Sequence, residues 1–339
     1  MAYTTVNKST DYFNTKLYTG TGSSNGVTGV GFQPDWVWIK CRDDSHNHQV
    51  FDVVRGVHKR LRTDTNGAET SSSESLKSFD SDGFTLGTQA NVNNSSNTFA
   101  AWNWKAGGTG SANNDGSIAT TVSVNTTAGF SIVKYDSTNT NGSTFGHGLG
   151  TTPGLIIIKN LDDAQNWLVY HKGLGTSKYL FLSTTAAEAS TSTWIAVSNT
   201  TFTMNNTFAS SNNGDNFIAY CFAEKTGYSK FGTYTGNGAN DGAFVYTGFA
   251  PSVVIFKVTS TTNNWNIFDN KRPGYNLNTS RFFPNLSNAE QVGTAEIDLL
   301  SNGIKFRNTN DNYNGSATYS YIAFGQSLVG SNNVPATAR

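Results

Sequence analysis

One ten-residue phrase occurs three times in the chain and constrains its fold more than any other feature. Each copy has a glycine, a proline three residues later, a short apolar run, and a lysine six residues after the proline. The copies are GFQPDWVWIK (31–40), GTTPGLIIIK (150–159) and GFAPSVVIFK (248–257). A phrase repeated at a long, regular interval indicates tandem copies of one structural unit.

The similarity extends well beyond the phrase. An aromatic residue lies 17 residues after each proline, and an Ala-Glu pair follows in each copy, four residues later in the third. These residues are Phe51, Tyr170 and Phe268, then Ala68-Glu69, Ala187-Glu188 and Ala289-Glu290. We predict three units, 1–107, 128–227 and 228–339. A Gly/Asn/Thr-rich linker arm (108–127) follows the first, and the third ends in a flexible tail.

The local patterns predict strands. The runs WVWIK, LIIIK and VVIFK are five residues long, rich in β-branched and aromatic residues, and preceded by proline, which is typical of a strand buried on both faces. Asp-Gly and Asn-Gly turn signals separate such runs, and the chain has 34 glycines. We therefore predict an all-β fold of three tandem jelly-roll or lectin-like β-sandwiches. The alternative is one large barrel made from all three units.

The charge, the cysteine count and the apolar runs of the chain limit the classes of binding partner that we expect. The chain has 23 basic and 23 acidic residues, and only 14% of its residues are charged. A nucleic-acid or anionic-membrane partner requires a basic surplus, so neither is expected. The two cysteines encode no disulfide framework, which is compatible with assembly in a reducing cytoplasm. The start of the chain lacks a secretory signal pattern, and its apolar runs are too short to insert in a membrane.

One loop collects metal-ligand residue types. The stretch CRDDSHNHQ supplies Cys41, Asp43, Asp44, His46 and His48. A metal site also needs a rigid frame with outer-shell support, whereas this stretch connects two expected strands. The corresponding loops, 160–167 and 258–265, lack both histidines. Loop polarity is the favoured interpretation, and metal binding remains open.

Other candidate sites have simpler interpretations. GSSNG (22–26) matches a nucleophile-elbow spelling around Ser24, but that chemistry needs a strand, a strained turn and a helix. His147 is interpreted as a satisfied turn histidine. The lysines that end the three core strands are expected to place solvated head groups there. We therefore assign no catalytic, cofactor-binding or metal residues and expect no enzymatic activity.

The repeat strings carry a resemblance. VGFQPDWVWIK with FDVVRG, HGLGTTPGLIIIKN with NWLVYHKGLG, and YSKFGTYTGNG with GFAPSVVIFK resemble a repeat family of virion structural proteins from marine tailed bacteriophages. Its members are often described as tail-fibre-like, and the resemblance covers about residues 11–327. It implies a component of the particle surface, assembled in the host cytoplasm, with jelly-roll or lectin-like domains and no cofactor.

Three functions compete at this point. The first is a tail-associated fibre or adhesin module that contributes to host attachment by contacting a surface glycan or protein. The second is a head decoration protein that braces capsomers. A carbohydrate depolymerase is less favoured, because glycosidases need two carboxylates at a defined separation.

The loops of the three units differ, which indicates a division of labour. We expect one or two units to dock on other virion proteins or on copies of the chain through aromatic-rich surfaces, since aromatic residues are enriched in interface cores. At least one other unit would face outward. The copies are expected to form a closed assembly, most simply a trimer.

Overall fold

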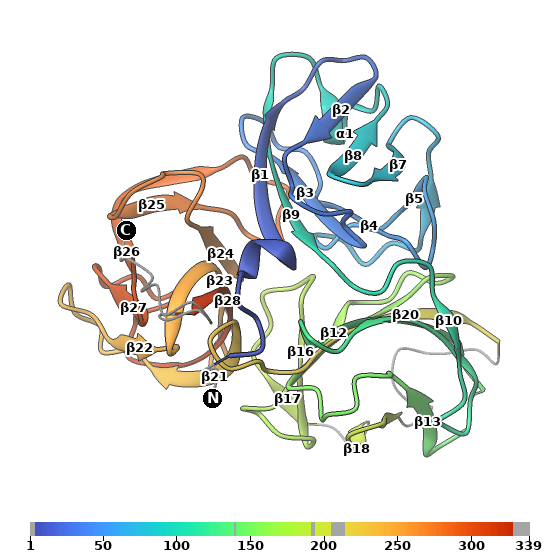
Figure 1. Cartoon of the computed structure of the whole chain (residues 1–339). Coiled ribbons are helices and arrows are strands. Elements are labelled where there is room, and N and C mark those ends of the chain that lie inside the picture. Colours follow the sequence, from blue (N-terminus) through green and yellow to red (C-terminus); the bar gives the residue numbers. More distant parts are fainter. Residues whose placement is uncertain (1–3, 139, 191–193, 205–213, 328–339) are drawn as a thin grey trace.

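The computed structural model describes residues 4–138, 140–190, 194–204 and 214–327. Apart from the short helical pieces η1 (Ser9–Asp11) and α1 (Ala90–Asn93), its regular elements are antiparallel strands, which confirms the all-β prediction. Figure 1 shows three lobes around a common centre, the first in blue and cyan, the second in green and yellow, the third in orange and red.

Each lobe contains a four-stranded arrangement in the same spatial order, here called its inner sheet. In the first unit the order is β1 (Phe13–Thr19), β9 (Thr98–Trp104), β3 (Trp36–Cys41) and β4 (Gln49–Asp52). In the second it is β12 (Phe130–Asp136), β20 (Asn216–Phe222), β14 (Leu155–Asn160) and β15 (Leu168–His171). In the third it is β21 (Ser229–Thr235), β28 (Thr318–Ser327), β23 (Phe249–Val258) and β24 (Asn266–Asp269).

The strand register places the repeated phrases in equivalent positions. Trp38, Ile157 and Ile255 each sit in the central strand that pairs with both the last strand of the unit and the strand that follows the loop. The repeat therefore exists in three dimensions as well as in the sequence.

A second sheet in each lobe, here called the outer sheet, also repeats. Its strands are β2 (Asn25–Thr28), β8 (Gly83–Leu86) and β7 (Leu76–Asp80) in the first unit, and β13 (Ser143–Gly146), β19 (Thr201–Met204) and β18 (Trp194–Val197) in the second. In the third they are β22 (Phe244–Tyr246), β27 (Gly303–Phe306), β26 (Gln291–Leu300) and β25 (Asn278–Arg281).

Shorter strands complete the sheets. β5 (Lys59–Arg60) pairs with β6 (Thr70–Ser71), while β16 (Lys178–Phe181) and β17 (Ala189–Ser190) extend the inner sheet of the second unit. The segment expected as a linker arm contains β10 (Ser111–Asn113) and β11 (Thr120–Asn125), and β11 pairs with β12. The arm is thus ordered as an added edge of the second unit. The expected flexible tail, 328–339, lies outside the described residues.

Apolar residues form four cores. Three of them lie within single units and join inner-sheet residues to outer-sheet residues, as in a β-sandwich. The fourth, here called the central core, is built from the opposite faces of all three inner sheets. On β14, Ile156 and Ile158 face the second unit's own core, whereas Leu155 and Ile157 face the central core.

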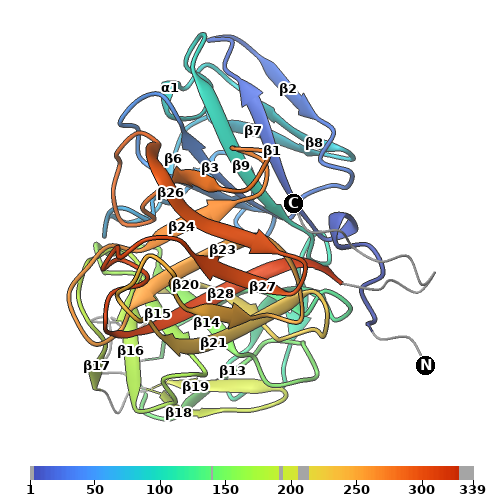
Figure 2. The ribbon, with the colours of Figure 1, turned by 90° about the vertical axis from the view of Figure 1, so that its left-hand side faces the viewer.

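Every inner sheet is therefore buried on both faces, as the short apolar runs predicted. Figure 2 shows the third lobe from its own side, with its strands lying across the first lobe above and the second below. In the described part of the chain the strands form separate sheets and not the single barrel considered as an alternative. No helix among these residues is long and apolar enough to cross a membrane.

Candidate functional site: the junctions between the three units

The residue just before each of β4, β15 and β24 has a side-chain ring nitrogen that lies within hydrogen-bonding distance of a backbone carbonyl in a neighbouring unit. The contacts are His48 Nε2 to Phe283 O at 3.0 Å, Trp167 Nε1 to Arg62 O at 2.8 Å, and Trp265 Nε1 to Phe181 O at 2.9 Å. The three acceptors occupy equivalent positions. The second residues of β4, β15 and β24 pair with Leu61, Leu180 and Phe282, and the acceptor is in each case the residue that follows. The first unit thus bonds to the third, the second to the first and the third to the second, which closes a ring.

His48 is the member of this ring that the sequence offered as a metal ligand. Its Nδ1 accepts a hydrogen bond from Trp38 Nε1 at 2.8 Å, so its Nε2 carries the proton and donates to Phe283 O. Burial, with a smaller contribution from the nearby Lys40 charge, lowers the pKa of His48 well below its usual value. The imidazole is therefore neutral at pH 7, and both of its nitrogens are used in structural contacts.

The other residues of that loop also have structural partners. Asp43 accepts hydrogen bonds from the backbone and hydroxyl of Thr98, the first residue of β9, and Asp44 accepts one from Asn97 Nδ2 at 2.6 Å. Cys41 is buried in the core of the first unit. Within the described ranges, His, Cys, Asp and Glu side chains do not gather in threes as a metal site would require. These carboxylates hold a loop against the start of a strand.

A second ring of backbone hydrogen bonds uses the repeated Ala-Glu pairs. The glutamate N–H groups donate to carbonyls two residues beyond the anchor lysines, and all three distances are 2.8 Å. The pairs are Glu69 to Leu161 O, Glu188 to Thr259 O, and Glu290 to Arg42 O. The sequence signal thus marks the place where each unit attaches to the next.

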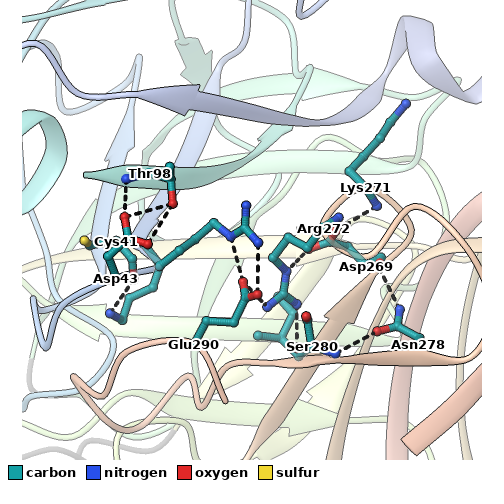
Figure 3. A network of polar contacts seen from close by, with 12 residues as sticks. Cys41, Asp43, Thr98, Asp269, Lys271, Arg272, Asn278, Ser280 and Glu290 are labelled. Carbon is teal, nitrogen blue, oxygen red and sulfur yellow. Dashed lines mark hydrogen bonds and ion pairs between the residues drawn. The ribbon is translucent and has the colours of Figure 1, made fainter. Parts of the chain in front are cut away.

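The third-to-first junction is closed by ion pairs, shown in Figure 3. Arg42 binds Glu290 with two nitrogens, at 2.8 and 3.0 Å, and Arg272 Nη1 lies 3.3 Å from the same carboxylate. Arg272 also bonds Asp269 Oδ2 at 2.6 Å, and both side chains are fully buried. Burial alone would raise the pKa of Glu290, but the Arg42 hydrogen bond and the two arginine charges lower it below its ordinary value.

The first-to-second junction has the same plan with different side chains. Glu69 binds Arg55 Nη1 and Lys59 Nζ, each at 3.1 Å, and Arg55 Nε lies 2.5 Å from Asp52 Oδ2. Tyr220, from the second unit, donates to the same Asp52 oxygen at 2.7 Å. An open cavity of about 240 Å³ remains at this junction.

The second-to-third junction lacks the buried Asp–Arg pair. The equivalent residues of the second unit are His171 and Leu174, and His171 Nε2 lies 3.1 Å from Tyr321 O of the third unit. Lys178 forms the ion pair with Glu188. The three junctions therefore share their backbone contacts but differ in the chemistry of their side chains.

The lysines that end the core strands are buried, which corrects the expectation of solvated head groups. Their ammonium groups donate to the carbonyl of the following residue: Lys40 to Cys41 O at 2.8 Å, Lys159 to Asn160 O at 2.7 Å, and Lys257 to Val258 O at 2.6 Å. These carbonyl groups replace water as acceptors, and the following loop adds a second one for two of the lysines, Asp44 O at 3.3 Å from Lys40 and Asp163 O at 3.2 Å from Lys159. Burial lowers the pKa of each lysine to about 8.

This lowering predicts an unusual pH dependence. Free lysine has a pKa of ~10.4, so between pH ~8 and ~10 the unfolded chain binds more protons at these positions than the folded chain does. Their contribution therefore makes the free energy of unfolding rise with pH across that window. Carbon-13 NMR of lysine Cε should show three side chains titrating near pH 8, one of them lost in Lys257→Met. Titration of all lysines near pH 10 would contradict the prediction.

The remaining sequence candidates are placed simply. Ser24 is exposed and directly precedes the strand β2, so no helix follows it as a nucleophile elbow would require. His147 is buried in the loop that directly follows β13, where its Nδ1 accepts from Leu149 N at 3.2 Å and its Nε2 lies 3.2 Å from Ser198 O. The interpretation of His147 as a satisfied turn histidine is confirmed.

A single family model spans all three units, matching residues 8–327. The chain belongs to the DUF7483 family. The family is described as a domain of unknown function, so this membership assigns no activity. No curated protein and no solved structure shows significant similarity to the chain. Because the DUF7483 match covers the whole closed ring, the family domain comprises the three units together.

The outer sheet of the third unit differs from its counterparts in this DUF7483 chain. Phe244 and Tyr246 on β22 are 47% and 53% exposed, and β22 is an edge strand at the outside of the third lobe (Figure 1). The register aligns these positions with Gly26 and Thr28 in the first unit and with Thr144 and Gly146 in the second. The other exposed large apolar side chains of the described ranges, Tyr275, Leu277 and Val292, also belong to the third unit.

The ring system was missed by sequence reasoning, although a signal existed. His48, Trp167 and Trp265 each lie 14 residues after the anchor proline, and each follows an asparagine. A side-chain ring with an N–H group at a constant distance from the anchor proline indicates a position that needs a hydrogen-bond donor. The residue names differ among the loops, but histidine and tryptophan share a ring N–H that can donate a hydrogen bond.

Proposed function

We propose that the protein is a structural component of a bacteriophage particle, tail-associated and of the fibre or adhesin type. In this proposal the third unit docks on neighbouring proteins, while the first two face outward and contribute to host attachment. The resemblance of the repeat strings to tail-fibre-like proteins supports the phage assignment.

The observation that carries the division of labour is the contrast between the outer sheets. Only the third unit, among the described residues, presents Phe244 and Tyr246 at positions where the other units have glycine or threonine. Lys230 lies 5.0 Å from the centre of the Tyr246 ring and bonds the Tyr246 carbonyl at 3.0 Å. Exposed aromatic rings on an edge strand favour docking, because they supply apolar area beside unpaired backbone groups.

Head decoration remains the second candidate. The described units form one closed block around a shared core, and a block of this shape suits bracing between capsomers as well as attachment at the tail. Immunogold labelling of purified particles with antibodies against the chain distinguishes the two locations. Absence of the chain from particles, by mass spectrometry, would contradict both.

A double substitution tests the docking surface. Phe244→Thr with Tyr246→Thr introduces the residue type that Thr144 and Thr28 supply at the equivalent positions, so the fold should be kept. We expect incorporation into particles to fall at least tenfold, because interface energy concentrates in a few aromatic anchors. The matched control is Thr28→Ser with Thr144→Ser, which alters the same strand positions of the other units. Normal incorporation of the threonine variant would exclude this surface.

Two further parts of the proposal stay predictions. The first is a trimer of copies, which a solution mass near three times 36.5 kDa would support and a monomer mass would contradict. The second is the lack of enzymatic activity, which turnover of bacterial polysaccharides or peptidoglycan by the purified chain would contradict.

A further inference from the structure

The cavity between the first and second units is lined mainly by polar and charged groups. Its volume is about 240 Å³, below the ~300–1,000 Å³ usual for drug-sized ligands, so it suits a single small ring. Its charged and polar lining is Arg55, Lys59 and Glu69 from the first unit with Lys134, Asp162 and Asn216 from the second. The Lys59 side chain is 43% exposed, and Asp162 is exposed, so the cavity opens to solvent on this side.

The third-to-first junction has a larger side chain at the position that Leu161 occupies beside this cavity. At the third-to-first junction, Arg42 fills the corresponding space and binds Glu290 with two nitrogens. The equivalent residue at the first-to-second junction is Leu161, which is shorter and cannot pair with Glu69. The cavity thus lies at a junction that lacks the arginine of the third-to-first junction, and the second-to-third junction has Thr259 at the same position.

The charges of the lining leave a positive surplus. Three cations face two carboxylates, a net charge of one positive. The donors of Arg55 are already used, on Asp52, Glu69, Tyr220 and two carbonyls, and Lys59 is shared with Glu69. The Lys134 backbone pairs within the sheet, but its ammonium group has no hydrogen bond or ion pair among the described residues.

Lys134 is also not required by the fold. The register of β12 aligns it with Leu17 of β1 and Thr233 of β21, so the equivalent positions carry uncharged residues. A lysine that projects into a cavity without a partner, where the repeat accepts leucine or threonine, indicates a ligand.

We propose that this cavity binds the carboxylate of an acidic sugar, a uronic acid unit of a polysaccharide. Lys134 and Lys59 would hold the carboxylate by charge-assisted hydrogen bonds. Asn216, Glu69 and Asp162 then accept hydrogen bonds from the sugar hydroxyls. The lining favours a uronate over phosphate, because Glu69, Asp162 and the Asn216 side-chain oxygen are acceptors that several sugar hydroxyls can satisfy, whereas a phosphate dianion carries at most one O–H donor.

Binding of the sugar is a property of the isolated chain. Only its role as a contact with a host glycan rests on the proposed function. A failure of particle localisation would therefore leave the binding site standing, and a failure of binding would leave the particle assignment standing.

The test is a titration of the purified full-length chain with glucuronate and galacturonate, followed by NMR and calorimetry. We expect saturable binding of at least one uronate, with shifts at Lys134 and Asn216 and no binding of neutral glucose or galactose. Inorganic phosphate is the comparison for the anion source. Phosphate binding more tightly than both uronates, or no saturable uronate binding, would overturn the proposal.

Two variants localise the binding to the cavity. Lys134→Leu introduces the residue found at the equivalent position of the first unit and should weaken uronate binding at least tenfold, since it removes a charge-assisted hydrogen bond. Leu161→Arg copies the residue that closes the third-to-first junction and should abolish binding while the chain stays folded. Lys271→Leu removes the same charge from an exposed site of the third unit and should leave affinity unchanged. Unchanged affinity in Lys134→Leu would contradict the site.

Discussion

Replacing Ile157 by aspartate is expected to unfold all three units together, and not the second unit alone. Ile157 is 4% exposed and faces the central core, where it pairs across strands with Tyr220 and lies beside residues from the other two units. Truncating a buried isoleucine to alanine costs about 2–5 kcal/mol, and burying an unpaired carboxylate costs several kcal/mol more. The sum approaches the ~5–15 kcal/mol that stabilises a typical protein.

Tryptophan fluorescence during urea unfolding measures this effect directly. Six of the seven tryptophans, Trp36, Trp38, Trp102, Trp104, Trp167 and Trp265, belong to the central core and report on its disruption. Ile157→Val is the control and should cost only about 0.5–1.5 kcal/mol. Hydrogen exchange then separates the alternatives. Full protection of β3 and β23 in Ile157→Asp would show that the units fold independently, contrary to this prediction.

The sequence predicted the all-β fold and the core strands well because their signals are local. Proline, apolar run and lysine recur at fixed offsets, and a five-residue run without polar alternation already indicates a strand covered on both sides. The part of the molecule that covers the second face of these strands was not predictable in the same way. It consists of the inner sheets of two other units, and contacts between units leave no period in the sequence of any one of them.

The lysines illustrate the same limit. A lysine at the end of an apolar strand normally extends into water. Lys40, Lys159 and Lys257 instead donate to the carbonyl of the last residue of their own strand, a geometry that depends on backbone conformation and not on residue type. The shared offset of the three lysines indicated a common role, but the burial that defines this role appears only in the structure.

The candidate site was hidden because the junctions diverge. Asp52 with Arg55 and Asp269 with Arg272 keep one spacing, but the second unit has His171 at the aspartate position and a leucine at the arginine position. A search for acids paired in every unit therefore rejects a pattern that is present in two of three. Once the strands are aligned, the second unit shows that the fold accepts histidine and leucine in place of the aspartate and the arginine.

The variant Arg272→Leu introduces into the third unit the leucine that the second unit carries as Leu174. Arg272 is fully buried, bonds Asp269, Glu290 and the Ile267 carbonyl, and lies 4.5 Å from the centre of the Phe282 ring. Removing one partner of a buried ion pair leaves the other charge uncompensated, which costs about 3–5 kcal/mol. We expect urea unfolding to show a loss of that size, whereas Lys172→Leu, which breaks an exposed pair with Glu224, should cost at most about 1 kcal/mol.

The double variant Asp269→His with Arg272→Leu copies the second unit and should recover at least half of the loss. A neutral imidazole can accept from the backbone as His171 Nδ1 does from Gly173 N at 3.1 Å, so no buried charge remains without a partner. Recovery should be incomplete. In the unsubstituted chain Trp102 Nε1 donates to Asp269 Oδ2 at 3.1 Å, and the double variant removes this acceptor. An unpaired buried donor costs about 1–3 kcal/mol. A double variant less stable than Arg272→Leu alone would show that the junctions are not interchangeable, and that the Asp–Arg pair is specific to the contact between the third and first units.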